Sequence, residues 1–356
     1  MNNKIAFPHL GNYYIPIKYF IKKITKCEII TPNINNQNTI KIGSAYSPND
    51  ICMPFKYNLG NYIDALNKGA NILIQAGGGC RYGYYAELQE QILENLGYNF
   101  CFINLIKTNH VSIIKLYQTA KELNPKLNIL IFTYYLIQGI LIIIYMDKLD
   151  NYRRLNTALA ENPEIFNILN KKMLKSYSRD KLSIYKIIKT YYKFKKKYHE
   201  IPLKEDKNTL KILLVGELYT LMDSAANNYL ENILLENNAI IYRYTNLTYL
   251  LLQKKFMQRK VLRQSKPYLK YTLGADGTES VAHTVYHCKK GIDGIIHIKS
   301  YGCVPELNAI PILNEVSKDY NVPILYLSYD GENNINNIDT KLEAFFDMLK
   351  CKKNNK

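Results

Sequence analysis

The N-terminal part of the chain alternates short apolar runs with longer amphipathic stretches. The apolar runs predict β-strands over residues 4–9, 28–31, 72–75 and 99–105. Apolar positions spaced three and four residues apart predict helices over residues 15–24, 61–68 and 84–96. Strands that alternate with helices in this way are typical of a parallel sheet covered by helices.

The pattern changes over residues 107–198, where strand signals are few. The apolar stretch 129–146 approaches the length of a membrane span. However, Gln138 and Gly139 interrupt it, and Tyr134 and Tyr135 lie near its middle rather than at its ends. We therefore interpret this stretch as a helix buried between domains, and we expect no membrane association.

Residues 171–200 are strongly basic and predict one helix, and residues 201–210 predict a linker. The basic helix has two interpretations. It is either a solvated helix face or a docking surface for an acidic protein partner or a ligand phosphate.

After the linker the alternation of strands and helices returns, and the chain repeats itself. Residues 4–13 are echoed by 211–219, 68–80 by 290–303, and 97–105 by 319–330. We therefore predict an α/β protein with two similar doubly wound parallel-sheet domains. Residues 1–106 and 209–356 form these domains, and residues 107–208 form a mainly helical insert with its linker.

Both copies of the repeat end a strand with Gly-Cys, as Gly79-Cys80 and as Gly302-Cys303. Open α/β sheets bind ligands beyond the carboxyl ends of their strands. A glycine at this place lets the backbone bend sharply and approach a bulky group closely. These four residues are therefore predicted to line a binding site.

A third cysteine, Cys52, precedes Pro54 and an amphipathic helix, whose first amides favour an anionic thiolate. Three soft ligands without a carboxylate cluster or a Cys-x-x-Cys pair favour an iron–sulfur cluster over structural zinc. Cys52, Cys80 and Cys303 are the predicted metal ligands. The cysteines interpreted as structural are Cys27, Cys101 and Cys351, and the role of Cys288 stays open.

The composition narrows the class of protein. A chain of 356 residues with 47% hydrophobic residues can bury a sizeable core. A net charge of +17 is typical of nucleic-acid partners, but arginine, the best residue for base readout, is scarce beside lysine, asparagine and isoleucine. We expect no nucleic-acid partner. Seven widely spaced cysteines and an N-terminus without a signal segment favour a reducing cytoplasm.

Two further features carry candidate chemistry. His283 and His287 are four residues apart on a predicted helix, with Thr278 or Ser280 as its N-cap. This spacing can hold a metal. The segment lacks a metalloprotease glutamate, however, so packing or hydrogen bonding is the favoured role of the two histidines.

Glu306 is either a hydrogen-bond acceptor or proton donor near the cluster, and hence catalytic, or a solvated carboxylate at a helix start.

Four segments together carry a family resemblance. They are residues 49–56 (NDICMPFK), 77–84 (GGGCRYGY), 294–297 (GIIH) leading to 302–306 (GCVPE), and 340–345 (TKLEAF). In this order they resemble the 2-hydroxyacyl-CoA dehydratase/benzoyl-CoA reductase D-component family, which is beta-subunit-like and includes proteins related to acyl-CoA dehydratase activases. The last segment departs from the family pattern at Gly331 and Lys341.

The resemblance implies that Cys52, Cys80 and Cys303 bind a [4Fe–4S] cluster, or a double-cubane cluster as in one branch of the family. It further implies an actin-like ATPase activator that delivers low-potential electrons, a related subunit in a homo- or heterodimer, and an acyl-CoA substrate that is dehydrated by a lyase reaction or reduced. Two alternatives stay open. One is a non-catalytic accessory or electron-transfer protein of the same fold, and the other is a nucleotide-binding enzyme that uses the loop Gly77–Gly79 for a phosphate.

Overall fold

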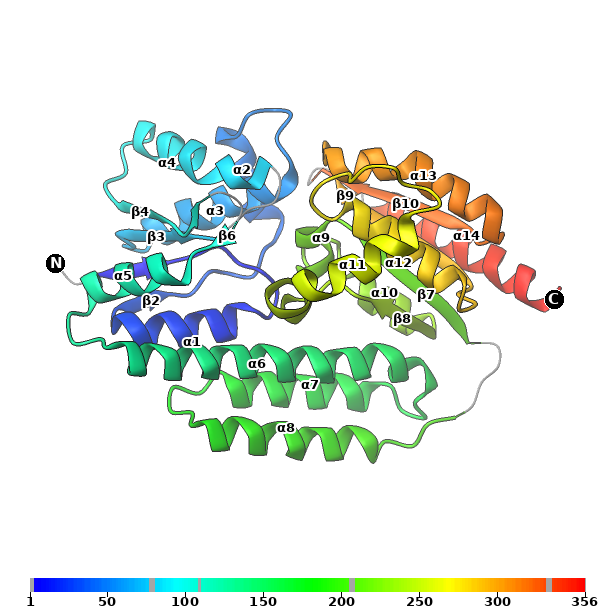
Figure 1. The fold of residues 1–356 in the computed structure, drawn as a ribbon, viewed down its shortest axis with the longest axis horizontal. Coiled ribbons are helices and arrows are strands. Elements are labelled where there is room, and N and C mark those ends of the chain that lie inside the picture. The colour runs from blue at the N-terminus through cyan, green and yellow to red at the C-terminus, as the bar shows by residue number, and fades with distance from the viewer. Residues whose placement is uncertain (1–2, 77–80, 108–109, 205–208, 331–334, 356) are drawn as a thin grey trace. The chain divides into compact units, whose positions relative to one another are not determined.

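The computed structural model describes residues 3–76, 81–107, 110–204, 209–330 and 335–355 (Figure 1). The chain divides into two compact units. Unit 1 comprises residues 1–143 and 174–188, and unit 2 comprises residues 144–173 and 189–356. Each unit contains one four-stranded parallel sheet. The predicted class, an α/β fold with two parallel-sheet domains, is therefore confirmed.

Unit 1 is built on the sheet order β2-β1-β3-β4. Its strands are β1 (Lys4–Ala6), β2 (Glu28–Ile30), β3 (Ile72–Gln75) and β4 (Cys101–Asn104), followed by the small antiparallel pair β5 (Ile106–Lys107) and β6 (His110–Val111). Its helices are α1 (Tyr14–Thr25), α2 (Gln37–Tyr46), α3 (Met53–Asn67), the 3-10 helix η1 (Arg81–Tyr84), α4 (Tyr85–Asn95) and α5 (Ile113–Leu123).

The apolar residues of unit 1 cover both faces of its sheet. Leu73 of β3 packs in one core cluster with Leu59 of α3. Its neighbours Ile72 and Ile74 point to the opposite face, where they pack with Ile21 of α1. Successive side chains on a strand alternate between faces, so a run of buried aliphatic residues requires helices on both sides.

Unit 2 repeats the arrangement with the order β8-β7-β9-β10. Its strands are β7 (Leu210–Gly216), β8 (Ala239–Arg243), β9 (Gly294–Ser300) and β10 (Ile324–Tyr329). Its helices are α9 (Leu218–Met222), α10 (Leu230–Glu236), the π-helix η3 (Tyr249–Gln253), α11 (Lys254–Ser265), α12 (Gly277–Cys288), α13 (Val304–Tyr320) and α14 (Ile335–Asn354). In each unit the first strand is central, with the second on one side and the third and fourth on the other, as the internal repeat predicts.

Helices also cover both faces of the sheet in unit 2. Leu213 of β7 packs with Val285 of α12 and Leu313 of α13 on one face. On the other face, a Cβ atom placed on Gly294 would lie 2.7 Å from the Leu349 side chain of α14. The absence of a side chain at Gly294 therefore lets α14 approach the start of β9 closely.

Within the residues predicted as a helical insert the chain forms α6 (Ile129–Asn156), the 3-10 helix η2 (Thr157–Leu159), α7 (Glu164–Tyr177) and α8 (Ile184–His199). One prediction here is wrong: residues 171–200 form two helices rather than one. The break lies between Tyr177 and Ile184. The Ser183 hydroxyl accepts a hydrogen bond from the Lys186 amide at 3.2 Å, so this serine caps the start of α8.

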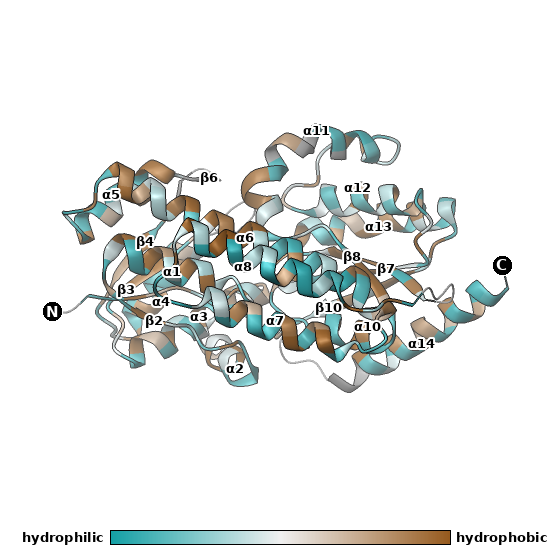
Figure 2. Ribbon diagram, turned by 90° about the horizontal axis from the view of Figure 1, so that it is seen from below, coloured by the Kyte–Doolittle hydropathy of each residue, from teal (hydrophilic) through white to brown (hydrophobic). Residues whose placement is uncertain are grey.

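The apolar stretch 129–146 lies within α6, as predicted, but it is less buried than expected. Only 33% of its most apolar 18-residue window is buried. Leu130 is 78% exposed, whereas Gln138 is fully buried and accepts a hydrogen bond from the Tyr19 hydroxyl at 2.7 Å. Figure 2 shows the brown apolar residues of α6 and the mostly hydrophilic α8. By length and composition α6 is the one helix among the described residues that could span a membrane.

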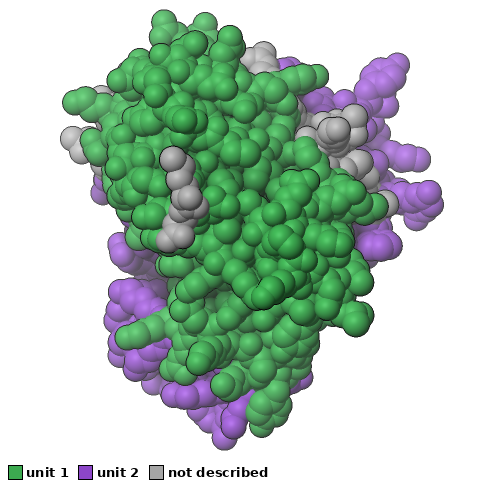
Figure 3. Space-filling view, turned by 90° about the vertical axis from the view of Figure 1, so that its left-hand side faces the viewer, with its two compact units in different colours: residues 1–143, 174–188 green, residues 144–173, 189–356 purple. Residues whose placement is uncertain are grey.

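The helices α6, α7 and α8 are each divided between the two units, which Figure 3 distinguishes by colour. In unit 2, α6 is held by buried charges. Arg243 at the end of β8 pairs with Asp150 of α6 at 3.7 Å, and Arg153 of α6 pairs with Glu231 of α10 at 3.6 Å. Burial alone would raise the pKa of Asp150, but Arg154, Arg153 and Arg243 outweigh it and hold this pKa well below its ordinary value.

Candidate functional site

In unit 2 the strand order reverses between the neighbouring strands β7 and β9, and the candidate site lies at their carboxyl ends. β7 is the central first strand, and the chain crosses to β8 on one side and to β9 on the other. Such a point is where open α/β sheets bind ligands. Here β7 ends at Gly216 and β9 ends at Ser300, three residues before Cys303.

Cys303 is the N-cap residue of α13, and its side chain makes no capping hydrogen bond to the helix. Its thiol is half-buried. Gly302, the residue before it, has φ +75°, a conformation that favours glycine. Cys303 and Gly302 therefore lie at the carboxyl edge of the sheet, where the sequence predicts them, next to the positive end of a long helix.

Lys299 lies close to Cys303 and was not predicted from the sequence as a site residue. It is 5% exposed, and its ammonium lies 6.0 Å from the centroid of the Tyr301 ring. Burial lowers the pKa of Lys299, and the Cys303 and Glu306 side chains oppose this shift.

Glu306 lies in the first turn of α13 and is 1% exposed. Its Oε2 atom is 2.7 Å from His297 Nε2, and its Oε1 atom accepts a hydrogen bond from the Ser280 hydroxyl at 3.1 Å. The interpretation of Glu306 as a solvated carboxylate is therefore wrong. Both oxygens join α13 to β9 and α12, which makes Glu306 a hydrogen-bond acceptor, and its role as a proton donor stays a prediction.

Glu217 follows β7 and is a second carboxylate near Glu306. It is the N-cap of α9 and accepts hydrogen bonds from the amides of Tyr219, at 2.8 Å, and Thr220, at 3.0 Å. Burial raises its pKa despite these hydrogen bonds, and the charge of Glu306 adds to the rise.

A charged cluster lies at the start of α12. Lys254 Nζ is 3.1 Å from Asp276 Oδ1 and 3.1 Å from Glu279 Oε1. Burial raises the pKa of Asp276 to about 7, with Glu306 and Glu279 adding to the rise and Lys254 opposing it. A carboxyl group with this pKa can take up and release a proton near neutral pH. Sequence patterns did not indicate this cluster, because Lys254 lies more than twenty residues before Asp276 and Glu279.

His283 and His287 both lie on α12, but the predicted N-caps are wrong. Asp276 is the N-cap, and Thr278 and Ser280 lie inside the helix. His283 stacks on Tyr244 with 3.7 Å between ring centroids. Burial lowers the pKa of His283 to about 3 and that of His287 to about 4, so both rings are neutral and packed at pH 7.

The lowered histidine pKa values predict acid sensitivity of unit 2. Between pH 6.5 and about 3 the unfolded chain binds a proton at His283 that the folded chain does not bind, so stability falls as the pH falls through this window. His283→Phe keeps an aromatic ring for the stacking but cannot bind a proton. We therefore expect this variant to lose about 2 kcal/mol less of its free energy of unfolding than wild type does between pH 7 and pH 5. Urea unfolding at pH 7 and pH 5 measures this. An identical pH dependence in variant and wild type would contradict it.

In unit 1, Cys52 is the N-cap residue of α3 and is half-buried, as the sequence predicts. Its thiol is hydrogen-bonded to the hydroxyl of Tyr85, the first residue of α4. Tyr85 packs edge-on against Phe55, with ring centroids 5.0 Å apart. Cys80 and Gly79, with the proposed phosphate loop Gly77–Gly79, lie outside the described residues.

A comparison with protein-family models identifies the relationship. Residues 141–349, more than half of the chain, match the model described as 2-hydroxyglutaryl-CoA dehydratase, D-component. The chain belongs to this family. No curated protein matches the sequence. The match confirms the resemblance seen in the sequence and supports a role like that of a 2-hydroxyacyl-CoA dehydratase D component.

The part matched to the 2-hydroxyglutaryl-CoA dehydratase D-component model includes Glu217, Lys299, Cys303 and Glu306 of unit 2. Cys52 and Cys80 lie outside the matched residues. Within the described part of the chain, no three His, Cys, Asp or Glu side chains lie close enough together to hold a metal ion. Cys303, with a half-buried thiol at a helix N-terminus, is the one predicted ligand within the matched residues.

The remaining cysteines differ in burial. Cys288 is buried, and burial raises the pKa of its thiol to about 12, which makes it a poor metal ligand. Cys101 and Cys351 are exposed. Cys27 is half-buried, and its thiol lies 3.6 Å from the carbonyl oxygen of Thr25, to which it donates.

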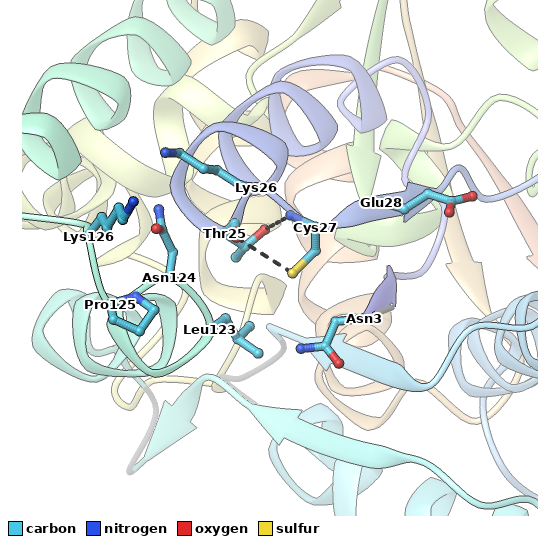
Figure 4. A pocket seen from close by; sticks show the side chains of 9 residues that line it. All are labelled: Asn3, Thr25, Lys26, Cys27, Glu28, Leu123, Asn124, Pro125 and Lys126. Carbon is cyan, nitrogen blue, oxygen red and sulfur yellow. Dashed lines mark hydrogen bonds between the residues drawn. The ribbon is translucent and has the colours of Figure 1, made fainter. Parts of the chain in front are cut away.

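Cys27 lines a pocket of about 570 Å³ in unit 1 (Figure 4). Asn3 precedes β1 and Glu28 begins β2, so this pocket lies at the amino ends of the strands. Lys26 and Lys126 also line it. The pocket is therefore at the opposite end of the sheet from the predicted site, and it is not where the fold would place the family's chemistry.

Proposed function

We propose that this chain is an iron–sulfur component of a 2-hydroxyacyl-CoA dehydratase or a related reductase, in which Cys52, Cys80 and Cys303 ligate one [4Fe–4S] cluster. A double-cubane cluster is the alternative form. The observation that carries the proposal is Cys303, a half-buried N-cap thiol at the carboxyl edge of the unit 2 sheet, within the part of the chain that matches the family. When bound, such a cluster supplies one-electron chemistry at low potential.

The residues of the chain would hold and insulate this group. Cys303 and Cys52 each begin a helix, and the amides of a helix N-terminus stabilise negative charge on a thiolate. Glu306, His297 and Ser280 fix the start of α13 against β9 and α12. The substrate would be an acyl-CoA thioester, and the protein would position it and exclude water.

An absorption spectrum of the full-length chain after anaerobic purification tests the proposal. A broad visible band with iron and sulfide in the same preparation supports a cluster. A colourless protein that also fails to take up iron and sulfide on reconstitution would overturn the proposal, and it would favour a non-catalytic accessory protein of the same fold.

The proposed electron donor is an actin-like ATPase activator, and α8 offers a surface for it. Lys193, Lys195, Lys196 and Lys197 are all exposed near the end of this helix. Complementary charge raises the rate of encounter between partners more than their final affinity. Positive charges at the C-terminal end of a helix also interact favourably with the helix dipole. The lysines therefore have a structural explanation as well.

Replacing these four lysines by glutamine separates the two explanations. We expect the activator to reduce the variant more slowly, by about tenfold at low salt, with a weaker dependence on ionic strength and unchanged iron content. Stopped-flow reduction across a salt series measures this. Reduction rates like those of the wild type, with a lowered melting temperature, would leave these lysines only a structural role.

A further inference from the structure

The first half of α6 has an apolar stripe on its surface. Leu130, Tyr134 and Ile137 are 78%, 42% and 44% exposed, and Leu141, the next residue in the series, is partly exposed. These four residues are spaced four, three and four positions apart, so they follow one another along one side of the helix. We call them the α6 stripe. All of them belong to unit 1.

The other side of α6 is anchored in unit 1. Phe132 is 1% exposed and packs with Ile24 of α1 and Ala120 of α5. Gln138 is fully buried and donates a hydrogen bond to the carbonyl oxygen of Leu182 at 3.3 Å. Because these contacts would be lost, α6 cannot leave the protein to cross a bilayer. The stripe can be covered only by something that binds at the surface of the protein.

The charges beside the α6 stripe are positive. Lys126 precedes α6 and is exposed. Lys181 and Lys186 are also exposed, and they lie on either side of Leu182 in the sequence, the residue that Gln138 contacts. Both lysines are therefore near the middle of the stripe. An apolar stripe next to exposed lysines is typical of a helix that lies in the boundary between lipid and water.

Charge separates the occupants that could cover the stripe. A second copy of the chain would bring its own Lys181 and Lys186 to the same place, and like charges across an interface repel. The neighbouring acid, Asp180, does not offset them, because it pairs with Lys22 at 2.9 Å. The occupant must therefore be apolar where it meets the stripe and negative where it meets the lysines.

Tyrosine favours a lipid surface over an acidic protein as this occupant. Tyr134 belongs to the stripe, and Tyr185, beside Lys186, is 69% exposed. Tyrosine side chains are enriched at the boundary between lipid headgroups and acyl chains. In a helix that lies along a membrane, the middle is at the same depth as the ends. The central position of Tyr134, which argues against a membrane span, therefore fits a helix that lies on the membrane.

We propose that the α6 stripe binds reversibly to an anionic lipid surface, with α6 parallel to the membrane and Lys126, Lys181 and Lys186 on the lipid phosphates. The expectation of no membrane association rested on the burial of residues 129–146, but only 33% of their most apolar window is buried. The inference is independent of the proposed function, since it uses no residue of the candidate site.

The first test uses tryptophan fluorescence, because the chain has no tryptophan of its own. Leu130→Trp places one reporter on the stripe. We expect its emission to shift to shorter wavelengths with vesicles of phosphatidylglycerol and phosphatidylcholine, and much less with phosphatidylcholine alone. Ile34→Trp, at a residue of unit 1 that is 62% exposed, is the matched control and should not shift. Tyr134→Trp replaces Leu130→Trp if that variant does not fold.

Three outcomes of this test would overturn the proposal. An emission that no vesicle changes would show that lipid does not cover the stripe. An equal shift with both kinds of vesicle would remove the role of the lysines. A shift that appears without vesicles as the protein concentration rises would show that a second copy of the chain covers the stripe.

The second test is sedimentation of the full-length chain with the anionic vesicles. We expect the bound fraction at low salt to fall about tenfold in Leu130→Asn/Ile137→Asn, and about tenfold in Lys181→Gln/Lys186→Gln with a weaker dependence on ionic strength. Lys318→Gln, at a lysine of α13 whose side chain is 73% exposed, is the control and should bind as wild type does. Unchanged melting temperatures show that the variants are folded. Binding like that of wild type in both double variants would contradict the proposal.

Discussion

Cys52→Ala, Cys80→Ala and Cys303→Ala are each expected to lose most of the bound iron. A cluster held by three protein thiolates that loses one of them is opened to solvent, and the remaining two ligands bind it much more weakly. We expect the iron content of each variant to fall about tenfold or more relative to wild type. Iron and sulfide analysis after anaerobic purification measures this, with circular dichroism to show that each variant is folded.

Cys27→Ala and Cys351→Ala are the matched controls and should keep their iron. Cys351 is exposed on the C-terminal helix α14, and Cys27 lines the pocket at the amino ends of the strands. Equal iron content in all five variants would refute the assignment of the ligands, even if the wild-type protein is coloured.

Gly216→Ala is expected to destabilise unit 2 strongly. Gly216 ends β7 with φ +134°, and a Cβ atom there would lie 1.7 Å from the carbonyl oxygen of Ile298 in β9. The same oxygen accepts a hydrogen bond from the Glu217 amide at 2.9 Å. The two central strands would have to separate, at a cost of more than about 4 kcal/mol.

Gly291→Ala provides the control for the backbone contribution alone. Gly291 has φ +75°, and no atom lies within 4 Å of the place where its Cβ would be. Only backbone strain opposes this change, so we expect about 1 kcal/mol of destabilisation. Urea unfolding of both variants measures the difference. A Gly216→Ala protein that is as stable as Gly291→Ala would show that β7 and β9 pair less closely than described.

The architecture was predictable because the chain is repeated. The echoes between residues 4–13 and 211–219, and between 68–80 and 290–303, correspond to β1 with β7 and β3 with β9. The strand β8, Ala239–Arg243, was not predicted, because a short run after two asparagines is hard to distinguish from a loop by periodicity alone. The helix break near residue 180 was missed because lysine continues the amphipathic pattern on both sides of it.

The candidate site was predictable only where a single segment carries it. Cys303 and Gly302 could be located because glycine and cysteine follow a strand directly. Lys299 resembled any charged residue near a strand end, and only the packing of α13 on β9 shows that its side chain is buried. The pair Asp276 and Lys254 was unpredictable for the same reason, since burial and ion pairing depend on tertiary structure.

The division of α6, α7 and α8 between the two units determines the order in which the chain can fold during synthesis. Unit 1 needs residues 174–188, so it is incomplete until they leave the ribosome, and by then residues 144–173 of unit 2 are already present. Asp147 receives its hydrogen bonds from Thr248, 101 residues later. The apolar helix α6 is therefore synthesised before the residues that it packs against in each unit. A nascent chain that ends between residue 156 and residue 248 exposes this helix and would need a chaperone most.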